Sequence, residues 1–198
     1  MIKRLFDLII ALPLLILVSP LLLIIGILIK LNSNGPIFYL QQRVGYKGVD
    51  FHIFKFRTMR IGSDKLGLLT VGGRDPRVTS VGYILRKYKL DELPQLINVV
   101  NGSMSLVGPR PEVRKYVDMY SSEQRNVLNA KPGITDYASI EYADENNLLA
   151  ASADPEKTYI EEIMPAKLKL NMKYISEQGV ITDLKIIFST VIRIIRGH

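Results

Sequence analysis

The sequence predicts a mostly helical α+β fold, with an N-terminal hydrophobic helix-break-helix over residues 1–31 and a compact domain with little β structure over 32–198. Three observations support this prediction. Ser19 is the only strongly polar side chain between Leu8 and Ile25. Helix-capping and proline-glycine turn signals recur through the rest of the chain. The last segment, 183–198, has the pattern of a basic amphipathic helix, which suits a membrane interface.

The N-terminal segment is long enough to cross a bilayer, which needs about 20 apolar residues. Ser19-Pro20 lies in its middle, and proline removes a backbone hydrogen bond, so a kink is expected. Lys3 and Arg4 precede the segment and Lys30 follows it, whereas a spanning helix usually has its basic residues on one side. A kinked single-pass anchor and a hairpin within one leaflet both fit these residues. We expect Asp7 to pair with Lys3 or Arg4 at helical spacing.

Two short runs of β-forming residues follow, Ile37–Leu40 and Phe51–Phe56, separated by a turn around Gly45. Lys55 and Arg57 lie at the end of the second run. These cations fit a basic face against lipid headgroups and, equally, a site that binds phosphate. A glycine-containing loop is expected over 64–74.

Two helices are expected on either side of an adjacent pair of carboxylates, Asp91 and Glu92. The first runs from about Ser80 to Tyr88 and carries Arg86. The second has Asp91 as its N-cap and ends at Asn101-Gly102. A helix start attracts phosphate through its free amide protons and its dipole. A carboxylate nucleophile there could attack a phosphoryl group, although an isolated Asp-Glu pair is more often an ordinary helix cap.

Several arginines lie next to prolines. Asp75-Pro76 precedes Arg77, and Pro109 and Pro111 fix the backbone on either side of Arg110. Guanidinium groups bind phosphate oxygens through a bidentate fork, so Arg77, Arg86 and Arg110 are candidate phosphate or nucleotide contacts. Structural salt bridges and an incidental arginine in a proline turn are the alternatives.

The C-terminal half is expected to be mainly helical. A short helix over 121–129 precedes a rigid turn at Lys131–Thr135, and the polar stretch 144–153 is expected as a mobile loop over a site. Asp154-Pro155 predicts a helix start, with an interruption at Pro165 and an end at Gly179. The amphipathic segment 183–198 suits packing into the core and lying in a membrane interface equally well.

Composition narrows the chemistry. The formal net charge of the 198 residues is +7, which favours anionic partners such as phospholipid or nucleotide. Cysteine is absent and the two histidines are far apart, so we expect any metal to be Mg²⁺ held by oxygen ligands. The basic residues are not clustered with aromatic ones in a nucleic-acid-binding pattern, so no nucleic-acid partner is expected.

Together these motifs resemble those of the bacterial sugar transferases, specifically the small monotopic phosphoglycosyl transferases that use polyprenol phosphate. The resemblance covers nearly the whole chain. Its most specific parts are Leu90–Val99, which reads LDELPQLINV, and Met104–Pro111, which reads MSLVGPRP. It also includes the following motifs: Ser19-Pro20, Gln42–Gly45, Lys55–Met59, Asp75–Thr79, Arg86 and Lys131–Thr135.

The resemblance implies transfer of a sugar 1-phosphate from a UDP-sugar to undecaprenyl phosphate, which yields an undecaprenyl diphosphosugar and UMP. It implies Asp91 as the nucleophile that forms an aspartyl-phosphosugar and as a ligand of Mg²⁺, with Glu92 as the partner that orients it or handles protons. The substrate-binding residues that it implies are Arg77, Arg86, Pro109, Arg110, Lys55 and Arg57.

The resemblance also implies a re-entrant membrane helix that breaks at Ser19-Pro20 and has both ends in the cytoplasm. The protein would then be monotopic, bound to the phospholipid bilayer at the cytoplasmic face of the bacterial inner membrane. This location fits the chemistry, because the lipid acceptor cannot leave the bilayer.

One segment departs from the family pattern. Many members carry a glycine and a Gln-Val-Asn-Gly-Arg-Asn-like run after the Ile-Thr pair, whereas Thr135 is followed here by Asp136–Tyr142. The role of 136–150, the donor sugar, the glycan pathway and the oligomeric state stay open, and a homo-oligomer is compatible with the sequence. A membrane-tethered scaffold for glycan assembly is the main alternative to an enzyme.

Overall fold

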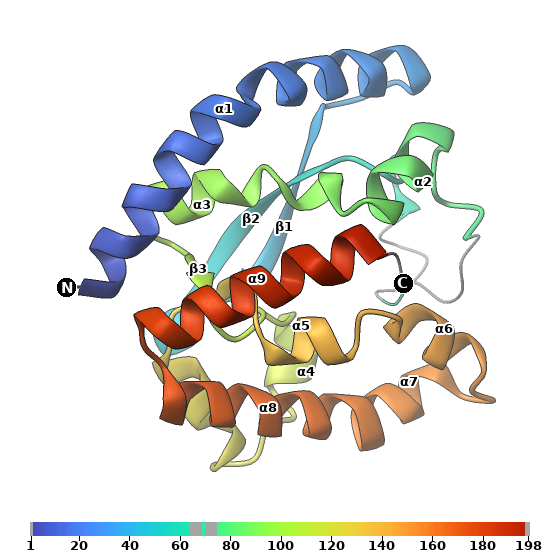
Figure 1. The fold of residues 1–198 in the computed structure, drawn as a ribbon. Helices are drawn as coiled ribbons and strands as arrows, with labels where there is room; N and C mark the ends of the chain where they lie inside the picture. Colours follow the sequence, from blue (N-terminus) through green and yellow to red (C-terminus); the bar gives the residue numbers. More distant parts are fainter. Residues whose placement is uncertain (1, 64–68, 70–74, 197–198) are drawn as a thin grey trace.

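Helices and two small sheets make up the part of the chain that the computed structural model describes, residues 2–63, 69 and 75–196 (Figure 1). β1 (Phe38–Val44) and β2 (Asp50–Phe56) form an antiparallel hairpin, joined by the short helix η1 (Tyr46–Gly48). β3 (Ser105–Val107) pairs in parallel with β4 (Gly133–Thr135). The prediction of a mostly helical fold with little β structure is confirmed. The loop expected over 64–74 lies outside the described residues, except for position 69.

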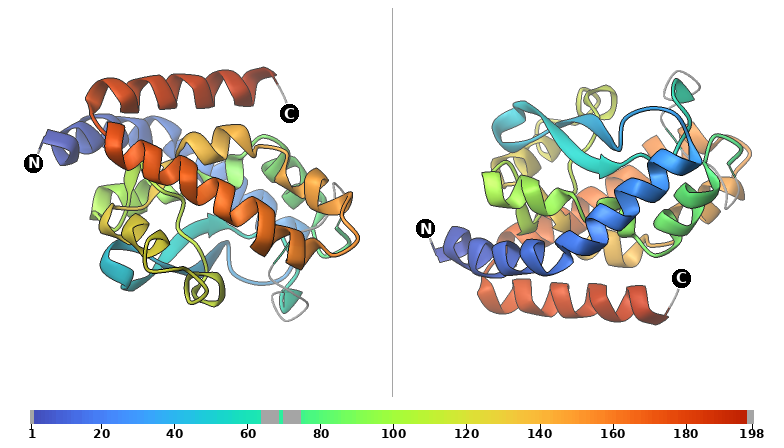
Figure 2. Two further views of the ribbon diagram at one scale, coloured as in Figure 1. Left: turned by 90° about the horizontal axis from the view of Figure 1, so that it is seen from below. Right: turned by 90° about the horizontal axis from the view of Figure 1, so that it is seen from above.

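The long N-terminal helix α1 (Ile2–Asn32) is continuous. The expected break at Ser19-Pro20 is therefore wrong as an interruption of the helix. The helix bends in its middle, as both Figure 1 and Figure 2 show, which agrees with the expected kink. Proline accounts for a bend because it removes one hydrogen bond of the helix and crowds the preceding turn. α1 is long and apolar enough to cross a membrane, with a mean hydropathy of 3.0 over its most apolar window.

Both ends of α1 nevertheless pack against the same domain. Near the N-terminus, Ala11 is fully buried in a cluster with Leu96, Val99 and Ile186. Near the C-terminus, Ile25 and Ile29 pack with Phe56 and Leu85. The helix therefore lies along the domain instead of projecting away from it.

Three charged side chains attach the N-terminal end of α1. Arg4 donates to the carbonyl oxygens of Val99 (2.5 Å) and Val100 (2.8 Å). Lys3 forms an ion pair of 2.5 Å with the buried Asp183. The expected pairing of Asp7 with Lys3 or Arg4 is wrong.

Asp7 is instead buried and accepts hydrogen bonds from Ser105 Oγ (2.8 and 3.0 Å) and from the Leu106 amide (3.1 Å). These partners lie about a hundred positions away along the chain. The buried carboxyl group of Asp7 therefore has two hydrogen-bond donors, as a polar group in a protein interior requires.

The carboxylate pair does not begin the second helix as expected. α2 (Ser80–Lys87) starts at Ser80, as predicted, with Thr79 as its N-cap, but Lys89 then adopts a left-handed conformation with φ 55°. The chain forms a short 3₁₀ helix, η3 (Leu90–Glu92), and Pro94 is the N-cap of α3 (Gln95–Asn101). The prediction of Asp91 as N-cap is therefore wrong. The predicted end at Asn101-Gly102 is confirmed, because Gly102 has φ 89° and its amide bonds back to α3.

The C-terminal half contains helices of several kinds. The predicted start at Asp154-Pro155 is confirmed, since the Asp154 side chain accepts from the Lys157 amide. Pro165 does not interrupt the helical run: it lies in the first turn of α8 after one π-helical turn, where a missing N–H costs little. These helices are α4 (Arg114–Val117), η4 (Gln124–Asn129), α5 (Tyr137–Glu141), α6 (Glu145–Ala150), α7 (Pro155–Thr158), the π-helical turn η5 (Tyr159–Ile163), α8 (Met164–Glu177) and α9 (Val180–Arg196).

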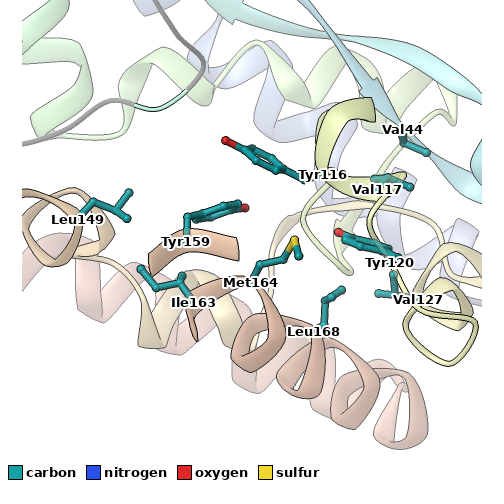
Figure 3. Close-up of a cluster of buried hydrophobic side chains, with 10 residues drawn as sticks. All are labelled: Val44, Tyr116, Val117, Tyr120, Val127, Leu149, Tyr159, Ile163, Met164 and Leu168. Atoms are coloured by element: carbon teal, nitrogen blue, oxygen red, sulfur yellow. The ribbon is translucent and has the colours of Figure 1, made fainter. Parts of the chain in front are cut away.

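A buried apolar cluster joins α8 and η5 to α4 and β1 (Figure 3). The rings of Tyr116 and Tyr159 lie with their centroids 4.8 Å apart, a separation at which aromatic rings attract one another. Leu168 of α8 and Val127 of η4 close the other side of the cluster. This packing supports the wall of the domain that faces the site described next.

We predict that Asp7→Ala destabilises the fold. The substitution leaves the Ser105 hydroxyl and the Leu106 amide buried without an acceptor, which costs about 1–3 kcal/mol. Thermal unfolding of the detergent-solubilised protein should show a lower midpoint. Glu123→Ala, at an exposed acidic residue, is the control. Equal midpoints for the two variants would contradict the role given to Asp7.

Candidate active site

A cleft of about 850 Å³ runs through the domain beside η3. Six of the residues singled out in the sequence line it: Asp91, Glu92, Lys55, Arg57, Arg86 and Arg110. They come from β2, the segment after it, α2, η3 and the turn after β3. The fold thus gathers two carboxylates and four cations, spread over 56 positions from Lys55 to Arg110, around one cavity.

Glu92 is the centre of the ionic contacts in the cleft. Arg110 engages both of its carboxylate oxygens, with Nη1 to Oε2 at 3.1 Å and Nη2 to Oε1. Lys55 Nζ lies 3.0 Å from Oε1. Burial alone would raise the pKa of Glu92, but Arg110 and Lys55 hold that pKa well below its usual range. Glu92 is therefore ionised at neutral pH.

Asp91 is in a different electrostatic environment although it is the next residue. Only 9% of it is exposed, and no hydrogen bond to its carboxylate is present among the described residues. Burial raises the pKa of Asp91, and the charge of Glu92 raises it further against the opposing effect of Lys55 and Arg86. A carboxylate that is poorly solvated and lines a cleft is a suitable nucleophile.

Two cations flank Asp91 from different sides. Burial lowers the pKa of Lys55, although Glu92 opposes this effect. Arg86 lies on α2 and donates from Nε to Thr58 Oγ1 at 2.9 Å. α2 approaches Thr58 closely at Gly82, where a Cβ would stand 2.1 Å from the Thr58 carbonyl oxygen. That close approach sets the position of Arg86 over the cleft.

Arg110 is held by its backbone as well as by Glu92. Its amide donates to the buried Asp136 carboxylate at 3.1 Å, and the carbonyl of Pro109 accepts from the Gly133 amide at 3.0 Å. A Cβ on Gly133 would meet the Gly108 amide nitrogen at 2.1 Å, so the two turns pack backbone to backbone. Pro109 therefore positions Arg110 and does not itself line the cleft.

Arg57 and Arg77 make structural contacts. Arg57 lines the cleft, is 95% buried, and donates to the carbonyl (2.7 Å) and hydroxyl (3.0 Å) of Ser33, just after α1. Arg77 forms an ion pair with Asp75, with 2.5 Å between Nη2 and Oδ2, and is not among the residues that line the cleft. Of the cations singled out in the sequence, Arg77 is the one that is absent from the described lining of the cleft.

A partly buried polar network that also lines the cleft was not singled out as a site from the sequence. Arg43 pairs with Glu112 at 2.9 Å, and Tyr159 donates to the other oxygen of Glu112. Burial raises the pKa of Tyr159, and Glu112 raises it further. Arg43 belongs to the Gln42–Gly45 motif, and Glu112 directly follows Pro111, the last residue of the Met104–Pro111 motif. These positions were the signal in the sequence that could have identified the two residues.

The side chains that line the cleft fit a divalent cation only if a bound substrate supplies further oxygen ligands. The described residues contain no group of three or more His, Cys, Asp or Glu side chains that could hold a metal. Glu92, Glu112 and Glu145 are engaged by cations, which leaves Asp91 as the carboxylate ligand among the described residues that line the cleft. Mg²⁺ commonly keeps several waters and binds through one or two carboxylates plus substrate phosphates. Asp91 with a bound diphosphate matches this mode.

The fold and the cleft together define a protein with a long apolar helix packed against a domain whose basic cleft suits phosphate compounds. The chain belongs to the bacterial sugar transferase family, whose sequence model matches residues 1–197. It is 39% identical, over 99% of its length, to the UDP-N-acetylgalactosamine-undecaprenyl-phosphate N-acetylgalactosaminephosphotransferase of Aeromonas hydrophila.

Two further relatives extend this comparison. The UDP-glucose:undecaprenyl-phosphate glucose-1-phosphate transferase of Escherichia coli strain K12 is 36% identical over 98% of the chain. The exopolysaccharide production protein ExoY of Sinorhizobium fredii is 34% identical over 96% of the chain. The chain spans 44% and 40% of the length of the Aeromonas and Escherichia proteins, and 83% of ExoY.

We predict that Asp91→Asn stabilises the fold at neutral pH. An acid whose pKa is raised by folding weakens the folded state once it is ionised. The increase in the free energy of unfolding should be complete at pH values above the pKa of Asp91 in the folded protein. It should vanish at pH values below the pKa of an unfolded aspartate, about 3.9. Thermal midpoints at several pH values test this, with Asp118→Asn, whose side chain is 60% exposed, as control. A lower midpoint for Asp91→Asn at neutral pH would contradict the assigned environment.

Proposed function

We propose that the protein transfers a sugar 1-phosphate from a UDP-sugar to undecaprenyl phosphate and releases UMP. The observation that carries the proposal is the buried, cleft-lining carboxylate of Asp91 beside Glu92, Lys55, Arg86 and Arg110. The family membership and the names of the relatives support the same reaction. The product enters bacterial glycoconjugate synthesis at its first membrane step.

The reaction proceeds in two displacements at the same phosphorus. The Asp91 carboxylate attacks the β-phosphorus of the donor, the bond to the UMP oxygen breaks, and UMP leaves with that electron pair. A phosphate oxygen of the lipid acceptor then attacks the aspartyl-phosphosugar, and the Asp91 carboxylate is released. A covalent intermediate of this kind divides one difficult displacement into two easier ones.

The cations of the cleft stabilise the charge on the transferring group. Arg110 presents a guanidinium that Glu92 holds from both oxygens, and Lys55 lies on the other side of Glu92. Preorganised donors of this kind act strongly because they need no reorientation during the reaction. Glu92 positions Lys55 and Arg110, and its low pKa argues against a role as proton donor. Mg²⁺, when bound by Asp91 and the diphosphate, would neutralise phosphate charge.

The membrane topology that best fits the contacts of α1 is re-entrant. Arg4 at one end of the helix and Ile29 at the other contact the same domain. A helix that crossed the bilayer would separate these ends by its thickness of about 30 Å of hydrocarbon. We place both ends of α1, and the cleft, at the cytoplasmic face of the bacterial inner membrane, where Asp91 can meet the phosphate of a membrane-bound acceptor.

We predict that purified protein releases UMP with undecaprenyl phosphate, Mg²⁺ and one member of a panel of UDP-sugars. A panel is needed because the relatives are named for different sugars, N-acetylgalactosamine and glucose. Release should stop on chelation and in Asp91→Asn. Normal turnover by Asp91→Asn would refute the nucleophile assignment. A scaffold would give no UMP with any donor and would tolerate changes at Asp91.

Arg110→Ala should lower kcat by about 10²- to 10³-fold, the usual effect of removing one preorganised donor. Steady-state UMP release is the measurement. Arg114→Ala is the matched control, because Arg114 pairs with Asp50 on the surface and does not line the cleft. Equal losses in the two variants would rule out a specific role for Arg110.

Single cysteines test the topology, since the chain has none of its own. Ile2→Cys and Asn34→Cys place a thiol near each end of α1 at exposed positions. An impermeant thiol reagent should label neither in intact cells and both after lysis. A spanning helix would instead expose exactly one of the two thiols to the reagent in intact cells.

A further inference from the structure

The cleft that contains Asp91 extends into the space between α1 and α9. The two helices meet at their N-terminal ends, where Lys3 pairs with Asp183, and α1 then bends away from α9 (Figure 2, right). Side chains from both helices line the cleft in this space, and they are Ile10 and Leu14 of α1 and Ile187, Thr190, Val191, Arg193 and Ile194 of α9.

The walls of this space are mainly apolar and partly open to the surroundings. Val191 is 48% exposed and Ile194 is 38% exposed, although both line the cleft. Leu14 on the α1 side is 37% exposed. Asp91 and its cations line another part of the same cleft, so two of its regions differ in chemistry: one is apolar and reaches the exposed faces of two helices, and the other is cationic.

Hydrogen bonds hold α9 in place against the rest of the domain. Tyr174 donates to Asp183 at 2.8 Å and to the carbonyl of Val107 at 3.1 Å. Further along α9, the hydroxyls of Thr190 and Thr135 lie 2.7 Å apart. These contacts hold α9 to β3 and β4 without filling the space toward α1. The space between α1 and α9 is therefore a fixed feature of the fold, because hydrogen bonds hold its α9 wall in place.

We propose that the space between α1 and α9 binds the hydrocarbon chain of the lipid acceptor, with Val191 and Ile194 as its α9 wall. A molecule with an anionic head and a long apolar chain matches both regions of the cleft. The exposed apolar residues of α1 and α9 give such a chain a continuous path from the bilayer to Asp91. This inference rests on the proposed function, because it assumes a polyprenyl phosphate acceptor.

The test compares acceptors of two chain lengths in Val191→Trp, whose larger side chain narrows the space. The ratio of kcat/KM for undecaprenyl phosphate to that for geranyl phosphate should fall by about tenfold or more, mainly through KM. The burst of UMP released from the donor without acceptor should stay unchanged. Phe188→Trp is the matched control on the same helix, because Phe188 is 68% exposed and does not line the cleft.

The outcomes separate this inference from the proposed function. If Val191→Trp left the ratio of the two kcat/KM values unchanged, the inference would be overturned. It would also be overturned if the variant lowered kcat/KM equally for both acceptors and lowered the UMP burst as well. Absence of UMP release by the unaltered protein would refute the function itself.

As a second measurement, Ile194 and Phe188 are each replaced by a photo-crosslinking phenylalanine derivative. Undecaprenyl phosphate should attach at position 194 in higher yield than at position 188, and excess unlabelled acceptor should suppress only the former. Equal yields at both positions would overturn the inference.

Discussion

The ion pairs of Glu92 with Arg110 and Lys55 are the interaction on which the rest of the site depends. They join three parts of the chain, the β-hairpin, η3 and the turn after β3, at one carboxylate. Burial raises the pKa of the adjacent Asp91, and the charge of Glu92, which these cations maintain in a buried place, raises it further. Two neighbouring carboxylates thus acquire opposite pKa shifts, a pattern that separates the roles of acidic groups in catalytic sites.

The attachment of α1 at both of its ends is the second constraint. Arg4 binds two of the last carbonyls of α3, and Asp7 binds the start of β3, so the helix is fixed to two segments that follow the dyad in the chain. Arg57 links the exit of α1 to the wall of the cleft through Ser33. The apolar helix is therefore part of the architecture of the site, and its bend away from α9 leaves space between the two helices.

The sequence predicted features that local chemistry determines. The start of α2 at Ser80, the end of α3 at Gly102 and the cap of α7 at Asp154 were predicted, because such signals act within a few residues. The grouping of the dyad with Lys55, Arg86 and Arg110 was also predicted, but from the family resemblance.

The errors concern conformations and contacts that no local signal in the sequence specifies. No local pattern shows that Lys89 turns left-handed and removes Asp91 from the N-cap, or that Asp7 finds its partners on β3. The stretch 144–153, expected as a loop, contains α6, where Glu145 pairs with Lys167 at 2.7 Å.

The most direct test of the central claim is the intact mass of the protein after incubation with Mg²⁺ and its UDP-sugar donor, without acceptor. The account predicts a mass increase equal to one sugar phosphate, located on Asp91 by peptide mapping, and its loss when undecaprenyl phosphate is added. An unmodified mass, together with UMP release only when donor and acceptor are both present, would contradict it, because the acceptor would then displace UMP directly.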